Sequence, residues 1–132
     1  MSNLVSDQGV VGSDVTGVGT GRSMAGATRY GVGLAIIAYG TTDGSNTVLS
    51  MSNKISIVGV VAADVSGVGT ARRSLGSASY GGDKGIFAYG HTASAITNIK
   101  NLVSNTGVIA ADVSGVGTSR ERLAGAGYSI SA

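Results

Sequence analysis

Short apolar segments, each bounded by glycine or by polar turn residues, recur along the whole chain. Two of them, 34–40 (LAIIAYG) and 85–90 (GIFAYG), are continuous apolar runs of the kind that a fully buried strand shows. Three shorter segments, at 3–6, 53–56 and 101–104, each lead through a turn that ends in glycine to a pair of β-branched residues. Because glycine accepts positive φ without steric penalty, this pattern predicts a β-hairpin at each of the three places.

A nonapeptide, Asp-Val-Ser/Thr-Gly-Val-Gly-Thr-x-Arg, follows each predicted hairpin. It runs from Asp14 to Arg22, from Asp64 to Arg72 and from Asp112 to Arg120, so successive copies are 50 and 48 residues apart. Repetition at such a period is typical of propellers, solenoids and arrays. Each glycine of the nonapeptide disfavours a helix by up to about 1 kcal/mol relative to alanine. We therefore expect an all-β chain with almost no helix.

The repeating unit defines the expected architecture. Each unit of about 49 residues holds four predicted strands, which is the content of one β-propeller blade. We interpret residues 1–132 as a single repeat domain of four-stranded blades, about 2.5 per chain. Its parts are a partial blade at 1–21, complete blades at 22–71 and 72–119, and a partial blade at 120–132.

Composition and charge exclude several classes of function. The net charge is +2 and charged residues make up 12 % of the chain, whereas a nucleic-acid binder needs a concentrated basic surface. There is no cysteine and one histidine, His91, so we expect neither a metal site nor a cofactor. The amino-terminal stretch lacks the features of a secretory signal, and no apolar run approaches the length of a membrane helix. We expect neither nucleic-acid binding nor membrane insertion.

The order of the motifs resembles the kelch repeat. An arginine (Arg72) opens the first strand, an apolar strand ends in an aromatic-glycine step at 86–90, and a third strand leads to a tight turn within 101–107. A single glycine replaces the double glycine of kelch repeats, and valine replaces the tryptophan that follows the turn. The resemblance implies a β-propeller of kelch-like blades.

A closer resemblance is to glycine- and alanine-rich kelch-like repeat proteins of aquatic and cyanobacterial bacteriophages. It rests on the segments 67–72 (GVGTAR), 80–87 (YGGDKGIF) and 101–108 (NLVSNTGV). This resemblance implies a non-enzymatic structural or adhesion protein of the virion, such as a fibre, decoration or appendage component. The expected location is the virion, or the surface of an extracellular particle.

The two partial blades predict an assembly of several chains. Propellers typically close with four to eight blades, and an unclosed propeller leaves sheet edges that invite pairing with another chain. We expect a homo-oligomer in which the 120–132 segment of one chain completes the blade that residues 1–21 of its neighbour begin. A dimer gives about six blades. A trimer and an open fibre are the alternatives, and other virion proteins are possible partners.

The candidate site residues are those that recur in every copy. The bracketing residues Asp14, Arg22, Asp64, Arg72, Asp112 and Arg120 are interpreted as structural, each carboxylate accepting backbone N–H bonds or pairing with an arginine. Tyr30, Tyr80 and Tyr128 are the candidate ligand contacts, because aromatic rings stack on sugars; packing between blades is the alternative. The alternative function is accordingly a lectin with glycan sites between blades. No residues form a catalytic constellation, and residues 17–22 lack the helix that a phosphate-binding glycine loop requires.

Overall fold

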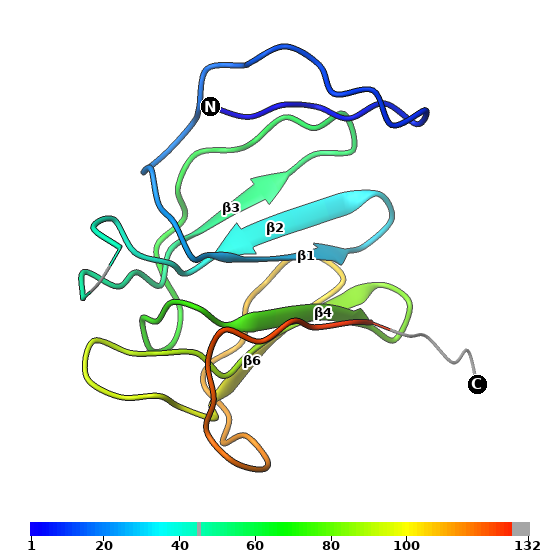
Figure 1. Cartoon of the computed structure of the whole chain (residues 1–132). Helices are drawn as coiled ribbons and strands as arrows, with labels where there is room; N and C mark the ends of the chain where they lie inside the picture. Colours follow the sequence, from blue (N-terminus) through cyan, green and yellow to red (C-terminus); the bar gives the residue numbers. More distant parts are fainter. Residues whose placement is uncertain (45, 128–132) are drawn as a thin grey trace.

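The computed structural model of the chain describes residues 1–44 and 46–127 (Figure 1). Within these ranges it contains six strands and no helix, so the fold is all-β as predicted. The strands form two antiparallel three-stranded sheets with the orders β1-β2-β3 and β4-β5-β6. Their bounds are Gly26–Tyr30 (β1), Leu34–Ala38 (β2), Ser52–Ile55 (β3), Gly76–Tyr80 (β4), Lys84–Ala88 (β5) and Lys100–Val103 (β6).

The two sheets have the same internal register. In the first, Gly26 pairs with Ala38 and Tyr30 with Leu34; in the second, equivalent pairs lie fifty residues further along the chain. The glycine turn predicted between β4 and β5 is confirmed, and Gly81 and Gly82 both have positive φ there. The first sheet lies in the segment 22–71 and the second in 72–119. We call these segments the first and second complete repeats.

The segment expected to form the fourth strand of each repeat is instead an irregular edge. Residues 61–65 touch β3 through two isolated bridges, Ile55 with Val61 and Ser52 with Val65, so that three residues (62–64) lie opposite two. Such a β-bulge interrupts the ladder and leaves the extra residue unpaired. The side chain of Asn53 fills the gap by donating to Ala62 O at 3.0 Å.

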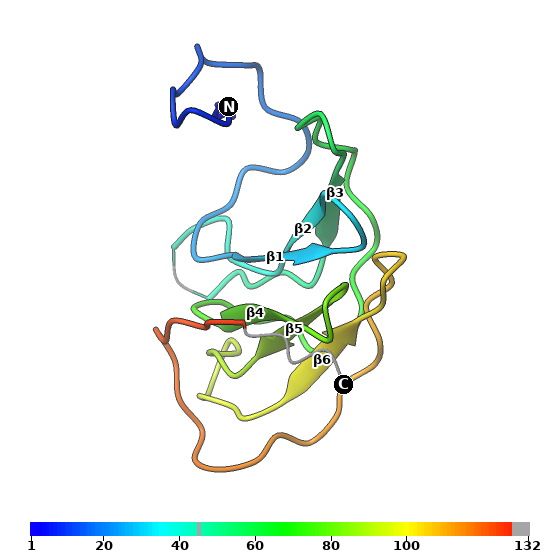
Figure 2. The same ribbon diagram turned by 90° about the vertical axis from the view of Figure 1, so that its right-hand side faces the viewer.

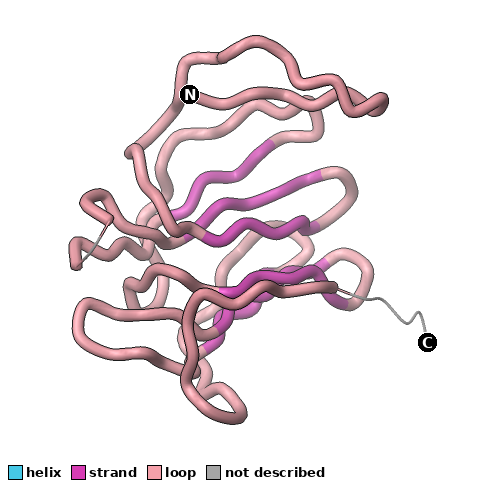
Figure 3. The backbone as a smooth tube through the Cα atoms, viewed as in Figure 1, coloured by secondary structure: helices cyan, strands magenta, loops and turns pink. Residues whose placement is uncertain are grey.

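The same bulge occurs in all three copies. Bridges connect 100 with 113 and 103 with 109 beside β6, and 2 with 15 and 5 with 11 in the N-terminal segment. Asn101 donates to Ala110 O at 2.9 Å, and Asn3 donates to Gly12 O at 3.1 Å. The three predicted hairpins are confirmed, with φ of 80°, 79° and 72° at their turn glycines Gly9, Gly59 and Gly107. Most of the remaining chain is loop (Figure 3).

The repeats lie one above another. Figures 1 and 2 show residues 1–21 over the first sheet, the first sheet over the second, and the orange segment at about 110–120 on the far side of the second. Strand β1 packs against β4 and β5. The core between the sheets is formed by Tyr30, Ile36, Ala38, Tyr39, Leu75, Phe87, Val103 and Ile109.

Burial of equivalent positions decreases toward the N-terminus. Val103 in β6 is fully buried, whereas its equivalent Val5 is 62 % exposed. Ile109 is 8 % exposed, and its equivalent Val11 is 64 % exposed. The hairpin at residues 2–15 thus presents to solvent the apolar side chains that the second complete repeat buries.

Candidate functional site

The recurrent polar residues form one hydrogen-bonded chain in each complete repeat. In the second, Arg72 donates from Nη2 to Asn101 Oδ1 at 2.7 Å, and Asn101 donates to Asp112 Oδ1 at 2.9 Å. The carboxylate of Asp112 also accepts the backbone N–H of Thr70 at 2.9 Å and its hydroxyl at 2.6 Å. The side chain of Arg72 is fully buried and donates further to carbonyl oxygens of Thr70, Phe87 and Tyr89. The arrangement fixes the loop before β4 onto the bulge beside β6.

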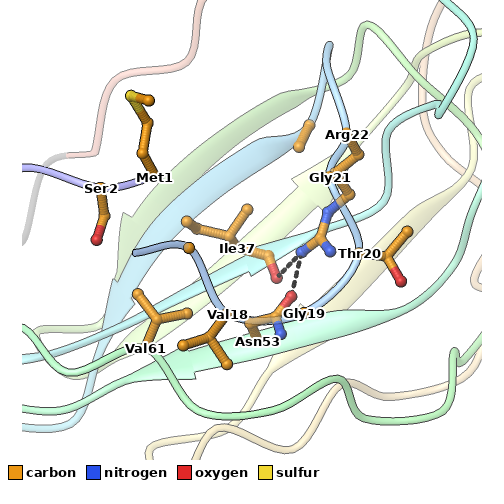
Figure 4. Close-up of a pocket in the computed structure, with 12 residues that line it drawn as sticks. Met1, Ser2, Val18, Gly19, Thr20, Gly21, Arg22, Ile37, Asn53 and Val61 are labelled. Atoms are coloured by element: carbon orange, nitrogen blue, oxygen red, sulfur yellow. Dashed lines mark hydrogen bonds between the residues drawn. The ribbon is translucent and has the colours of Figure 1, made fainter. Parts of the chain in front are cut away.

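The first complete repeat contains the same chain of bonds. Arg22 donates to Asn53 Oδ1 at 2.5 Å and to Ile37 O at 3.3 Å, as Figure 4 shows. Asn53 donates to Asp64 Oδ1 at 2.8 Å, and Thr20 donates to Asp64 from its backbone and its hydroxyl. Arg22 and Asp64 also form an ion pair at 3.8 Å. Asp64 thus pairs with the arginine of the preceding nonapeptide, and an asparagine and a threonine are additional members of the network.

The remaining equivalents of these residues are Asn3 and Asp14 near one end of the described chain and Thr118 and Arg120 near the other, and we call this set the divided constellation. Asn3 donates to Asp14 Oδ1 at 2.8 Å, as its equivalents do. Among the described residues, no threonine donates to Asp14 and no arginine donates to Asn3. Arg120 instead donates to the hydroxyl of Tyr89 at 2.7 Å. In the described structure, the predicted residues Asp14 and Arg120 thus make only some of the bonds that their equivalents make.

The hydrogen bonds keep the carboxylates of the two complete copies ionised. Bonds from Asn53 and Thr20 hold the pKa of Asp64 below its ordinary value, and the charge of Arg22 acts in the same direction. Partial burial raises the pKa of Asp112, but bonds from Thr70 and Asn101, with the charge of Arg72, outweigh it and leave the pKa lowered. Burial lowers the pKa of Arg72, a shift that Tyr39 and Asp112 oppose. These charges hold the scaffold together.

Two tyrosines outside the predicted set connect one repeat to the next. The ring of Tyr39 lies under the guanidinium of Arg72, 4.1 Å from its central carbon, and packs edge-on against Phe87 at 5.5 Å. Its hydroxyl donates to Val68 O at 3.2 Å. Tyr89 repeats this arrangement, with Arg120 over its ring at 4.3 Å and a hydrogen bond to Val116 O at 2.9 Å. The recurrence of Tyr-Gly at the end of each apolar run was the sequence signal for this role.

The tyrosines predicted to contact a ligand are placed differently from one another. Tyr30 is 4 % exposed, lies against Gly107 and has the ammonium group of Lys54 6.0 Å from its ring centroid. Tyr80 is half-buried at the end of β4. Tyr128 lies outside the described residues. A ligand-binding role of these side chains stays a prediction.

A pocket lies where the N-terminal segment meets the first sheet. Its lining includes Met1, Val18, Arg22, Ile37, Asn53 and Val61 (Figure 4). The side chain of Arg22 is only 7 % exposed, and its Nε is buried without a hydrogen-bond partner. This pocket therefore combines apolar walls with a buried cation.

The described part of the chain shows no group of three or more His, Cys, Asp or Glu side chains that could hold a metal ion. Nor do residues 1–44 and 46–127 include a helix long and apolar enough to cross a membrane. Comparisons of the chain with models of known protein families and with curated proteins found no match.

Proposed function

We propose that the chain is a non-enzymatic structural protein whose repeats are β-propeller blades, and that it serves as a component of a bacteriophage particle. The observation that carries this proposal is that the recurrent polar residues form hydrogen bonds with one another within the fold. Arg72, Asn101 and Asp112 bond to one another and to Thr70 of the preceding nonapeptide, and the first complete repeat has the same bonds. Residues that recur because the scaffold needs them point to a structural protein.

The packing of the sheets supports the propeller part of the proposal. Blades of a propeller are antiparallel sheets that follow one another around an axis. Here β1 packs against β4 and β5, and no equally close contact joins β3 to β6. Two sheets that are close at their first strands and apart at their third strands are what we expect of neighbouring blades, which fan out from an axis.

The divided constellation supports assembly into a homo-oligomer. Asn3 and Asp14 form the acceptor half of the constellation, and Thr118 and Arg120 are the equivalents of its donor half. A second copy of the chain therefore carries the groups that the first copy lacks. A dimer is the expected state, with a trimer or an open fibre as alternatives.

Native mass spectrometry and analytical ultracentrifugation test the assembly. A single oligomeric species is expected at micromolar concentration, and a stable folded monomer would contradict it. The virion part of the proposal rests on the sequence resemblance alone, and mass spectrometry of purified particles of the encoding virus tests it. Absence of the chain from those particles would remove this part.

A glycan array with the assembled protein tests the alternative function of a lectin. No binding at millimolar sugar is expected for a purely structural component. Binding that is lost in Tyr80→Ala would instead establish a lectin, because the half-buried Tyr80 is the more exposed of the two described candidate tyrosines.

A further inference from the structure

The pocket beside Arg22 is the counterpart of two sites that the chain fills with its own tyrosines. In the second complete repeat, Tyr39 contacts Arg72, Phe87 and Val68 O. The equivalents of these three residues in the preceding repeat are Arg22, Ile37 and Val18, and all three line the pocket.

We propose that this pocket binds a tyrosine side chain of a partner protein, presented on a strand that ends in Tyr-Gly. The phenol ring stacks on the guanidinium of Arg22 and its edge packs on Ile37. The hydroxyl donates to Val18 O, as Tyr39 does to Val68 O and Tyr89 to Val116 O. This goes beyond the proposed function, because it defines the chemistry of one partner side chain.

The backbone around the pocket supplies a second point of recognition. Gly40, which follows Tyr39, donates its N–H to Arg72 O at 2.9 Å, and Gly90 donates to Arg120 O at 2.9 Å. The equivalent carbonyl, that of Arg22, accepts no backbone N–H from the described residues. A Tyr-Gly step therefore satisfies two groups at once, the Val18 carbonyl with its hydroxyl and the Arg22 carbonyl with its glycine N–H.

The described tyrosines of the chain do not supply this ring. Tyr39 and Tyr89 occupy the sites of the following copies. Tyr30, which is buried in the core, and Tyr80, at the end of β4, do not line the pocket. Met1 lines the pocket, but its side chain is 85 % exposed and Figure 4 shows it directed away from Arg22. None of the described Tyr-Gly steps therefore enters the pocket.

The experiment uses two blocked tetrapeptides, Ac-Ala-Tyr-Gly-Thr-NH₂, which has the sequence of residues 38–41, and its phenylalanine analogue. Each is titrated into the ¹⁵N-labelled full chain, and backbone and arginine side-chain shifts are followed by NMR. The tyrosine peptide is expected to shift the signals of Arg22 Nε–H and of residues 17–21. It should bind about 3- to 10-fold more tightly than the phenylalanine peptide, because one neutral hydrogen bond distinguishes them.

The variant Arg22→Lys removes the planar cation, and Arg29→Lys is the control because Arg29 is exposed in β1 and does not line the pocket. Binding should weaken in the first variant and stay unchanged in the second. Equal affinity for both peptides, or shifts that map away from the pocket, would overturn the proposal. If Arg22→Lys does not fold, the comparison of the two peptides on the unaltered chain still decides. A negative result in the peptide titration would not contradict the proposed structural function, because that function is tested separately by the oligomeric state and by presence in particles.

Discussion

The guanidinium carbon of Arg72 lies 4.1 Å from the ring centroid of Tyr39, and the two residues belong to adjacent repeats. Arg72 also donates to Asn101 and to the carbonyl of Tyr89 within its own repeat. One buried side chain thus joins two repeats and orders the loop between them. Arg72 therefore has a larger effect on stability than its exposed equivalent, Arg120.

Replacing Arg72 with lysine is expected to lower the free energy of unfolding by about 3 kcal/mol, the cost of leaving a buried network without one partner. An ammonium group keeps the charge but has no planar face for Tyr39 and too few donors for the acceptors around Arg72. Urea denaturation followed by circular dichroism measures the change. Arg120→Lys, at an exposed position, should cost less than about 0.5 kcal/mol. Equal losses in the two variants would contradict the role of burial.

The lowered pKa values of Asp64 and Asp112 predict loss of stability in acid. A carboxyl whose pKa is lower in the folded than in the unfolded state contributes stability that is complete above the unfolded value, about 3.9. That contribution disappears as the pH falls through the folded pKa. The melting temperature should therefore decrease as the pH is lowered from 5 to about 2.5.

The double variant Asp64→Asn/Asp112→Asn isolates this effect. It should be less stable than the unaltered chain at pH 6, and its melting temperature should depend less steeply on pH below about 4. Asp7→Asn, in the exposed turn of the first hairpin, controls for the loss of a surface charge. An unchanged slope in the double variant would show that other groups control the acid transition.

Gly107 and Gly9 are equivalent turn residues with different surroundings. Both have positive φ, but a Cβ at Gly107 would lie 2.6 Å from Cζ of Tyr30, whereas nothing lies within 4 Å of one at Gly9. Gly9→Ala should cost about 1–2 kcal/mol for the left-handed backbone. Gly107→Ala should cost about 1–3 kcal/mol more, from overpacking against Tyr30.

A double-mutant cycle with Tyr30→Leu tests the origin of that excess. The smaller side chain should recover part of the cost of Gly107→Ala and none of the cost of Gly9→Ala. Thermal unfolding of the unaltered chain, the three single variants and the two double variants gives the coupling. Additive effects of Tyr30→Leu and Gly107→Ala would mean that the hairpin of Gly107 moves away from the Tyr30 ring without loss of stability.

A cysteine pair tests the joint between chains, since the sequence contains no other cysteine. Thr70→Cys/Asp112→Cys replaces side chains that are hydrogen-bonded at 2.6 Å and should oxidise within one chain. Thr118→Cys/Asp14→Cys, at the equivalent positions, should form covalent dimers or larger species on non-reducing gels. If the first pair oxidises fully and the second remains monomeric, the two halves of the divided constellation do not meet between chains.

The local conformation of the chain could largely be predicted from its sequence. Glycine at 9, 59 and 107 marks the hairpin turns, because few other residues accept positive φ at low cost. The apolar run at 34–40 contains β2, and the run at 85–90 contains all of β5 except its first residue, Lys84. The fourth strand was predicted and is not regular. The order of apolar and polar residues in this segment does not reveal the bulge. The bulge depends on the side chain of Asn53, which replaces a backbone N–H as the donor to Ala62 O.

The contacts between repeats could be predicted only in part. The Asp and Arg of each nonapeptide were recognised as structural, but their connection through Asn53 and Asn101 was missed, because these residues lie in short polar stretches without a distinctive pattern. The site of Tyr39 was missed because its arginine is 33 positions away. Tyr89 and Arg120 are 31 positions apart, so only the recurrence of both residues in each repeat linked them.

The links between β2 and β3 and between β5 and β6 are the place where the two complete repeats differ in length. Thr41 bridges to Val48 seven positions later, whereas His91 bridges to Ile96 five positions later. The difference of two residues between the nonapeptide intervals therefore falls in a loop outside the hydrogen-bonded chain of the recurrent Arg, Asn, Asp and Thr residues. Insertions and deletions can accumulate there without disturbing the spacing of the network. The same loops are the natural positions for grafting a tag or an epitope onto each repeat.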